Sequence, residues 1–147
     1  FQLVAERLES VDGSLYHYRN NAQSMTAAFE PHLTETIFIP LDILRTYFDT
    51  DKRALFAQYQ MYAAYLLQLW VRNQASLDCD LDRKGLRQSC ARVCQNQELR
   101  ALLASVPGAL PKQVAVAVRA VQQQKPGQLY LLIKAWNLYY KLRNGRA

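Results

Sequence analysis

The sequence has 147 residues, half of them hydrophobic and about a fifth charged, with five Gly and five Pro and no low-complexity tract. These proportions are typical of one globular domain, here residues 1–147, and they exclude a largely disordered chain. The net charge of +6 is unevenly distributed, because residues 1–82 carry −5 and residues 83–147, with Glu98 as their single acid, carry +11.

The N-terminal part of the chain is predicted to form helices over residues 1–10, 15–29 and 40–48. Pro31 ends the second helix, since the residue before a proline avoids the helical region, and another proline suits the first turn of the third helix. Residues 36–39 are β-branched and apolar, so we expect this segment to be extended.

The chain begins at Phe1 rather than Met. We therefore expect an expressed segment, a processed product or a piece of a longer chain. Residues 1–10 have the pattern of an amphipathic helix and lack the apolar run of a signal peptide. A targeting segment, if the chain had one, has been removed.

The most hydrophobic predicted helix covers residues 52–73. No charge occurs from Ala54 to Val71, which raises the question of a membrane span. Three glutamines and three tyrosines in the same stretch argue against a span, because amides are costly in hydrocarbon without partners. We therefore predict the central helix of a bundle, and we do not expect a membrane partner.

Three shorter helices are predicted to follow. The first covers residues 81–95, and residues 96–97 break or bend the chain before a second helix over 99–106. A Pro-Gly loop then precedes a helix over 112–124. Alternating valines in this last segment also suit a strand. Valines spaced by four and three positions fit one helix face, and the proline ahead and the glutamines behind favour the helix.

The last predicted helix covers residues 128–143 and is apolar over most of its circumference. Its polar residues form one narrow stripe, so we expect the helix to be enclosed by neighbours or by a partner chain. It is the second of two largely apolar central helices, with 52–73. The predicted fold class is therefore all-α, a compact bundle or short array of about six to seven helices in a single domain.

No motif for catalysis, a metal or a cofactor stands out. The five glycines form no phosphate-binding loop, and His17 and His32 are expected to be ordinary packed or surface residues. Asp78, Asp80 and Asp82 alternate as in some calcium loops, but the central Gly and the distal Glu of that pattern are missing. We predict a helix cap at this point instead.

The chain has three cysteines, Cys79, Cys90 and Cys94. An odd number argues against a closed disulfide framework, and we expect buried or idle thiols in a reducing compartment. This expectation favours an intracellular protein. A disulfide from Cys79 to either of the others is the alternative, whereas a zinc site lacks a fourth ligand nearby.

Two short segments allow a comparison with an enzyme family. Arg7 and residues 48–54 resemble the secreted, helical chorismate mutases over a minor part of the chain. The resemblance implies an enzyme that binds a dicarboxylate inside a helical bundle through several Arg or Lys and a Gln or Glu. The lysine of that family falls at or near Tyr18, with Arg19 one step beyond, and residues 24–29 offer no second arginine. Such an enzyme is therefore the third candidate function.

The basic half is predicted to carry the functional surface, because helices packed side by side would present six or more cations together. The candidate basic residues are Arg83, Lys84, Arg87, Arg92, Lys134, Lys141 and Arg143. The candidate aromatic anchors for a partner are Trp70, Trp136, Tyr139 and Tyr140. The alternatives are a basic face neutralised by the acidic N-terminal half and aromatic residues that belong to the core.

Two main classes of function follow. The first is a non-enzymatic interaction domain, a subunit or docking module of a larger assembly, whose basic half faces an acidic protein partner or another copy. The second is nucleic-acid binding, because a cationic patch attracts phosphate backbones. We favour the first class. Salt dependence separates the two, since a phosphate binder loses affinity steeply with salt.

Overall fold

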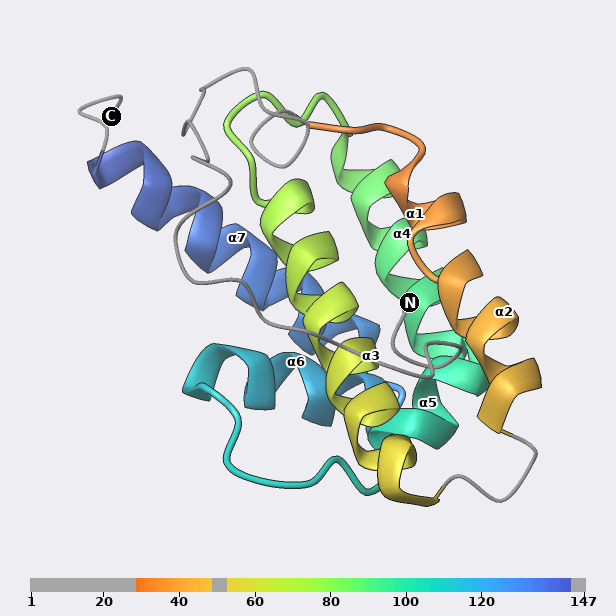
Figure 1. Ribbon diagram of the computed structural model, residues 1–147. Helices are drawn as coiled ribbons and strands as arrows, with labels where there is room; N and C mark the ends of the chain where they lie inside the picture. The colour runs from red at the N-terminus through yellow and green to blue at the C-terminus, as the bar shows by residue number, and fades with distance from the viewer. Residues whose placement is uncertain (1–28, 49–52, 144–147) are drawn as a thin grey trace, which may run out of the picture.

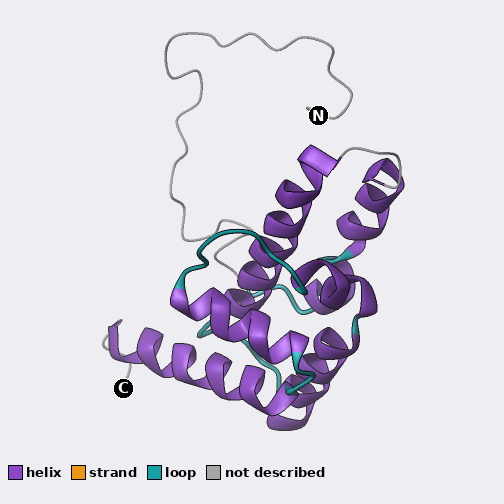
Figure 2. Ribbon diagram, turned by 90° about the horizontal axis from the view of Figure 1, so that it is seen from below, coloured by secondary structure: helices purple, strands orange, loops and turns teal. Residues whose placement is uncertain are grey.

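The computed structural model describes residues 29–48 and 53–143, and every regular element in these ranges is an α-helix (Figure 1, Figure 2). The helices are α1 (Leu33–Thr36), α2 (Ile39–Phe48), α3 (Arg53–Gln74), α4 (Arg83–Gln95), α5 (Gln97–Leu103), α6 (Lys112–Gln122) and α7 (Pro126–Arg143). They pack into a small bundle, which confirms the predicted all-α fold class. The helix predicted for residues 1–10 and nearly all of that predicted for 15–29 lie outside the described residues.

The chain before α3 turns between two helices instead of running straight. The prediction that residues 36–39 are extended is wrong, because Thr36 ends α1 and Ile39 starts α2. Ile37 and Phe38, adjacent in the sequence, are both buried. A strand would point them to opposite faces, whereas the turn lets both reach the core. Burial therefore outweighs β-propensity here, and α2 itself confirms the short helix predicted to follow.

The helix α3 lies at the centre, as predicted, and packs against α1, α2, α5, α6 and α7. Its glutamine Gln60 is buried, and the side-chain amide donates to the Leu102 carbonyl at 3.2 Å and to Ser105 Oγ at 2.9 Å. This buried amide thus finds its partners inside the bundle. Within the described ranges, no helix combines the length and the hydropathy that crossing a membrane requires.

Two side chains set the boundaries of α4 and α5. Asp82 precedes α4, and its Oδ1 accepts a hydrogen bond from the Gly85 amide at 2.6 Å, which is the helix cap predicted at this point. Asn96 ends α4 and begins α5, since its Oδ1 accepts from the Leu99 amide at 2.9 Å. The chain therefore breaks at Asn96 rather than bending, and α5 starts ahead of the predicted residue 99.

The valine-rich segment forms the helix α6, as the spacing by four and three positions predicted. Val114, Val118 and Val121 are buried, while Val116 between them is exposed. Alternating strand geometry would have placed Val116 on the same face as Val114 and Val118. The burial of only one helical face therefore settles the choice between strand and helix.

The connection from α6 to α7 is a helix-ending motif with one left-handed residue. Gln124 has a φ of 51°, and its amide donates to the Val121 carbonyl at 3.1 Å, while the Lys125 amide donates to the Ala120 carbonyl at 2.8 Å. These two hydrogen bonds form the Schellman pattern and satisfy the last carbonyls of α6. Pro126, which has no amide hydrogen to satisfy, then takes the first position of α7.

The helix α7 forms one edge of the bundle in Figure 2, where it leads to the C-terminus. It packs against α3, α4 and α6 and contributes Leu129 and Ile133 to the core. Asn137 Nδ2 donates to the carbonyls of Ala75 and Ser76, both at 3.2 Å, and ties α7 to the loop after α3. Its other side faces away from the described helices.

Candidate partner-binding surface

The outer face of α7 carries a row of exposed apolar side chains. Leu131, Leu138 and Leu142 are 66%, 58% and 65% exposed, and Ala135 between them is also exposed. The spacings of four, three and four residues align these positions along one side of the helix. The same spacings recur in the seams of coiled coils. We refer to Leu131, Ala135, Leu138 and Leu142 as the leucine ridge.

The leucine ridge has basic residues on both sides. By helical periodicity, Lys134 and Lys141 lie along one side and Arg143 lies along the other, and all three side chains are exposed. No ion pair within the described ranges includes any of them. The sequence also contains no Asp or Glu after Glu98. The helix α7 therefore contributes only positive charges beside the leucine ridge.

Beside the ridge, the end of α7 and the end of α3 enclose an aromatic groove of about 460 Å³. The rings of Trp136 and Tyr140 meet edge to face with centroids 6.2 Å apart, and those of Tyr139 and Tyr140 lie 5.8 Å apart. Arg72 and Arg143 line the same groove. The structure thus brings three of the four predicted aromatic anchors together with one of the predicted basic residues.

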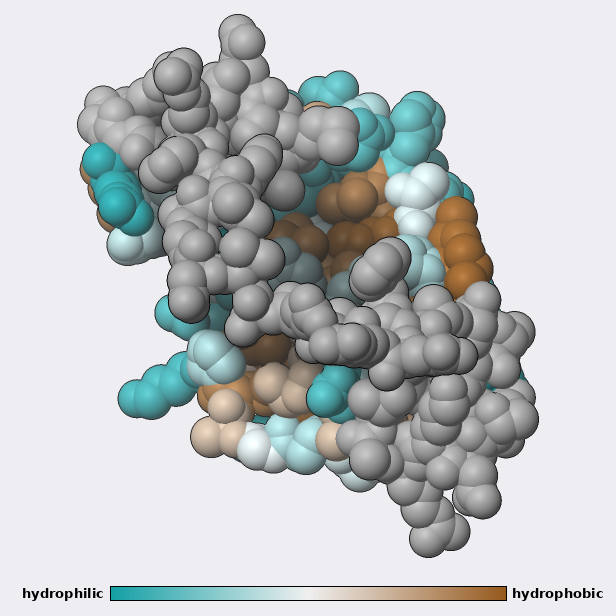
Figure 3. All heavy atoms as spheres, in the orientation of Figure 1, coloured by the Kyte–Doolittle hydropathy of each residue, from teal (hydrophilic) through white to brown (hydrophobic). Residues whose placement is uncertain are grey.

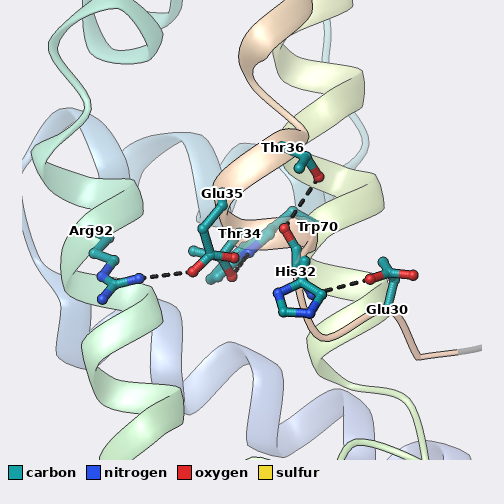
Figure 4. Close-up of polar contacts among 7 residues, drawn as sticks. All are labelled: Glu30, His32, Thr34, Glu35, Thr36, Trp70 and Arg92. Atoms are coloured by element: carbon teal, nitrogen blue, oxygen red, sulfur yellow. Dashed lines mark hydrogen bonds and ion pairs between the residues drawn. The ribbon is translucent and has the colours of Figure 1, made fainter.

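Two of the predicted site residues lie elsewhere and already have partners (Figure 4). Trp70 has no exposed surface, and its Nε1 donates to Thr34 Oγ1 at 3.0 Å, so this side chain belongs to the core. Arg92 points from α4 toward α1, where it pairs with Glu35 at 2.8 Å. Neither side chain contributes to the face formed by α7.

The remaining predicted cations lie at the start of α4. Arg83 and Arg87, one helical turn apart, line a depression of about 700 Å³ together with Lys125 and Tyr130. The guanidinium of Arg87 lies over the Tyr130 ring, 5.3 Å from its centroid. Lys84 is exposed and lines neither this depression nor the aromatic groove. The seven predicted basic residues are therefore distributed over several places.

A second apolar surface lies on another face of the bundle. Figure 3 shows apolar atoms beside α3 and at α2. Exposed apolar side chains on these two helices include Ile39, Phe56 and Met61. Arg45 on α2 already pairs with Glu98 at 3.0 Å. This surface therefore lacks the row of unpaired charges that would define the chemistry of a partner, and α7 is the better-defined candidate.

Sequence reasoning did not single out the leucine ridge, Arg72 or Lys125. The signal for the ridge is present in the sequence, since Leu131, Leu138 and Leu142 recur at coiled-coil spacing. It was hidden because leucines and aromatic residues surround almost the whole of that helix, so no face stood out. Arg72 and Lys125 come from other parts of the chain, and only packing brings them to these two depressions.

Metal binding and reactive thiols are the other chemistries to consider among the described residues. No group of His, Cys, Asp or Glu in these ranges is arranged to hold a metal ion. All three cysteines are free thiols, and burial raises the pKa of Cys90 to about 12 and that of Cys94 to about 11, so both stay protonated at neutral pH. His17 lies outside the described residues, as do Arg7, Tyr18 and Arg19, which carry most of the chorismate-mutase comparison.

Comparisons with protein-family models, with curated proteins and with solved structures found no match for this chain. A function is therefore inferred from the surface of the protein itself. The observations that bear on it are an exposed apolar ridge, the cations beside it and the two depressions at the ends of α7.

Proposed function

We propose that this protein is a helical interaction domain that binds a partner protein through the outer face of α7. The observation that carries the proposal is the leucine ridge, in which three leucines are each more than half exposed. Covering such side chains removes apolar surface from water, at about 25 cal/mol per Å². A partner that lies along the ridge therefore gains free energy of association from it.

The expected partner element is an amphipathic helix with acidic flanks. The spacing of the ridge accepts the apolar stripe of another helix. Lys134 and Lys141 on one side, and Arg143 on the other, would then face the flanking residues of that helix. Glu or Asp at those positions would be attracted to the cations, whereas Lys or Arg would be repelled.

A second copy of the chain suits the ridge less well. Two α7 helices packed ridge to ridge would place cations against cations, because both sides of the ridge are basic and α7 contains no acid. Like charges that face each other across an interface weaken association. An acidic partner protein is therefore proposed in preference to pairing between copies.

The aromatic groove adds an anchoring point to the ridge. Trp136 and Tyr139 offer an apolar wall beside the guanidinium groups of Arg72 and Arg143. Aromatic and arginine side chains are those that most often dominate the free energy of an interface. A partner side chain with an apolar body, followed by a carboxylate, would fill this groove and pair with either arginine.

The proposal is tested with two labelled synthetic helical peptides, one with Leu at its core positions and Glu at its flanks, the other with every Glu replaced by Lys. Anisotropy titrations with the full chain should give saturable binding of the Glu peptide and none of the Lys peptide. Leu138→Asp should weaken binding of the Glu peptide roughly tenfold or more, because it places a charge at the centre of the covered surface.

The matched control is Val116→Asp, which places the same charge on an exposed valine of α6 away from the ridge. This variant should bind the Glu peptide as the unchanged chain does, and circular dichroism should find both variants equally helical. Equal binding of the two peptides, or full affinity in Leu138→Asp, would contradict the proposal. A dimeric native mass at low salt without peptide would favour a second copy as the occupant.

Nucleic-acid binding is the second candidate function. It is favoured by the net charge of +11 over residues 83–147, since a phosphate backbone binds cations without sequence readout. The cations are divided between the start of α4, the sides of the ridge and the pair that Arg92 forms with Glu35. Because these charges do not form one continuous patch, they support nucleic-acid binding less directly than the leucine ridge supports protein binding.

A further inference from the structure

We infer that the depression between the start of α4 and the start of α7 binds a phosphate group carried on a flat apolar body, as in a nucleotide. This basic pocket is lined by Arg83, Arg87, Lys125, Pro126, Gly127, Gln128, Tyr130 and Leu131. Its volume of about 700 Å³ lies within the range of small-molecule sites in proteins. The basic pocket shares Leu131 with the leucine ridge, but the inference rests on the cations and the ring of the pocket and not on partner binding by the ridge.

The basic pocket gathers three positive charges, and its lining contains no carboxylate. Arg83, Arg87 and Lys125 come from two separate parts of the chain, and no ion pair within the described ranges includes them. The acid nearest in sequence, Asp82, caps α4 through the Gly85 amide at 2.6 Å. Three cations around one pocket repel one another. A bound dianion would replace this repulsion with attraction and charge-assisted hydrogen bonds.

Hydrogen bonds fix the backbone at Lys125, and an aromatic ring packs against the guanidinium of Arg87. Lys125 follows the left-handed Gln124, and its amide donates to the Ala120 carbonyl at 2.8 Å, which fixes the chain at the pocket wall. The guanidinium of Arg87 rests on the Tyr130 ring at 5.3 Å. Packing on a ring restricts the rotamers of arginine and leaves its N–H edge available for two oxygens of one phosphate.

The rest of the pocket suits a flat, apolar group. Pro126 and Leu131 supply aliphatic surface next to Arg87, and both bases and arginine guanidiniums stack on flat partners. A Cβ added at Gly127 would meet no heavy atom within 4 Å, so the pocket is open beside the first turn of α7. In that turn Pro126 has no N–H, and the Gln128 and Leu129 amides donate to the Lys125 carbonyl at 3.0 and 3.4 Å, which leaves the Gly127 amide for an anion.

The first experiment titrates the full chain by calorimetry with adenosine monophosphate, adenosine and inorganic phosphate. The inference predicts saturable binding of the nucleotide, with weaker binding of either part alone. A single-stranded DNA oligonucleotide then separates the two sources of the ligand. If the oligonucleotide competes with the free nucleotide, the ligand of the pocket is a nucleic-acid strand. If the nucleotide binds and the oligonucleotide does not compete, the ligand is a free nucleotide. Both results require binding in the pocket.

The sharpest variant is Gly127→Glu, with Gly127→Gln as its matched control. Both replace a helical glycine with a better helix former in open space, so both should raise the melting temperature. Only the glutamate places a negative charge at the pocket mouth. Nucleotide binding should therefore be about tenfold or more weaker in Gly127→Glu than in Gly127→Gln.

A second pair of variants checks that the binding belongs to this pocket. Arg83→Glu and Lys112→Glu reverse one charge each at the first residue of α4 and of α6, where an acid favours the helix. Arg83→Glu should weaken nucleotide binding roughly ten- to hundredfold, the range expected for a lost charge-assisted hydrogen bond, and Lys112→Glu should not.

Three outcomes would overturn the inference. They are a lack of saturable nucleotide binding, equal affinity in the two Gly127 variants, and equal weakening by Arg83→Glu and Lys112→Glu. Leu138→Asp, which disrupts the leucine ridge, should leave nucleotide binding unchanged. A failure of this inference is therefore distinguishable from a failure of the proposed protein partner.

Discussion

At the scale of single residues, the aromatic side chains show how position separates residues of one type. Trp70 has no exposed surface and donates its indole N–H to Thr34. Tyr139 is 55% exposed at the rim of the aromatic groove. Both occur in helices that are apolar over most of their circumference, so the sequence pattern assigns neither to the core nor to the surface. Only the neighbours that pack around each helix decide the matter.

The substitution Trp70→Ala should lower the free energy of unfolding by about 3–5 kcal/mol, the range for large aromatic residues removed from a core. Tyr139→Ala should change it by less than about 0.5 kcal/mol, as for ordinary surface positions. Urea denaturation followed by circular dichroism measures both values. A similar loss in the two variants would mean that Tyr139 is part of the core.

The buried thiols predict how stability depends on pH. Burial, followed by the neighbouring Cys94, raises the pKa of Cys90 from 9.0 to about 12, and burial raises that of Cys94 to about 11. The unfolded chain therefore ionises these thiols at lower pH than the folded protein does. Their contribution to stability is fully present below about pH 9 and is lost as the pH rises toward the folded pKa values.

The melting temperature should accordingly be level up to about pH 8.5 and fall above about pH 9, where the unfolded state binds fewer protons than the folded state. Burial also raises the pKa of Tyr59 to about 12, which acts in the same direction at still higher pH. Cys90→Ala should reduce the slope above pH 9. A melting temperature that stays constant through that range would show that these thiols ionise equally in both states.

At the scale of helices, the sequence predicted most of the elements because their ends are chemically marked. Asp82 precedes α4 as a cap, prolines stand at the starts of α6 and α7, and α3 contains a long stretch without charge, from Ala54 to Val71. These signals act over a few residues, so they can be recognised without knowledge of the fold. They place helices but do not say which side of each helix is covered.

The structural features that could not be predicted from the sequence depend on contacts between residues far apart in the chain. Ile37 and Phe38 have β-branched and aromatic side chains that suit a strand, yet the core accepts both only from a turn between helices. The leucine ridge is exposed because α3, α4 and α6 all pack on the other side of α7. The basic pocket forms only where the starts of α4 and α7 meet. Local patterns carry no information on any of these pairings.

The end of α6 offers a test at this scale. Gln124 has the positive φ that favours glycine, and a side chain costs roughly 1 kcal/mol in that conformation. Gln124→Gly should therefore stabilise the protein by up to about 1 kcal/mol, less whatever its side chain contributes beside Arg100. Gln123, with a φ of −84°, gains nothing from glycine, and Gln123→Gly should lower stability. Thermal unfolding of both variants measures the difference.

At the scale of the whole molecule, the unequal distribution of charge is only partly neutralised within the fold. Arg92 pairs with Glu35 and Arg45 pairs with Glu98, so each ion pair joins the acidic part of the chain to the basic part. Both arginines are well exposed, and such pairs contribute about 0–1 kcal/mol each. In the described part of the basic half, Arg92 is the cation that forms an ion pair.

The salt dependence of binding should identify which kind of partner the molecule takes. Association with the Glu-flanked peptide rests on the apolar ridge, so its affinity should fall by less than about tenfold between 50 and 200 mM salt. A protein that held a nucleic acid by six or more phosphate contacts would lose about a thousandfold over the same interval. Anisotropy titrations at the two concentrations, with the peptide and with an oligonucleotide, measure both quantities.

The side-chain amide of Asn137 ties α7 to the carbonyls of Ala75 and Ser76, 62 and 61 residues earlier in the chain, through two hydrogen bonds of 3.2 Å. These hydrogen bonds hold α7 in the conformation that binds a partner before the partner is present. Association would then require little conformational change. Differences in affinity between partners would come mainly from the dissociation rate and not from the association rate. Without these hydrogen bonds, in Asn137→Ala, α7 would have to adopt its binding position during association, so the partner should bind more slowly.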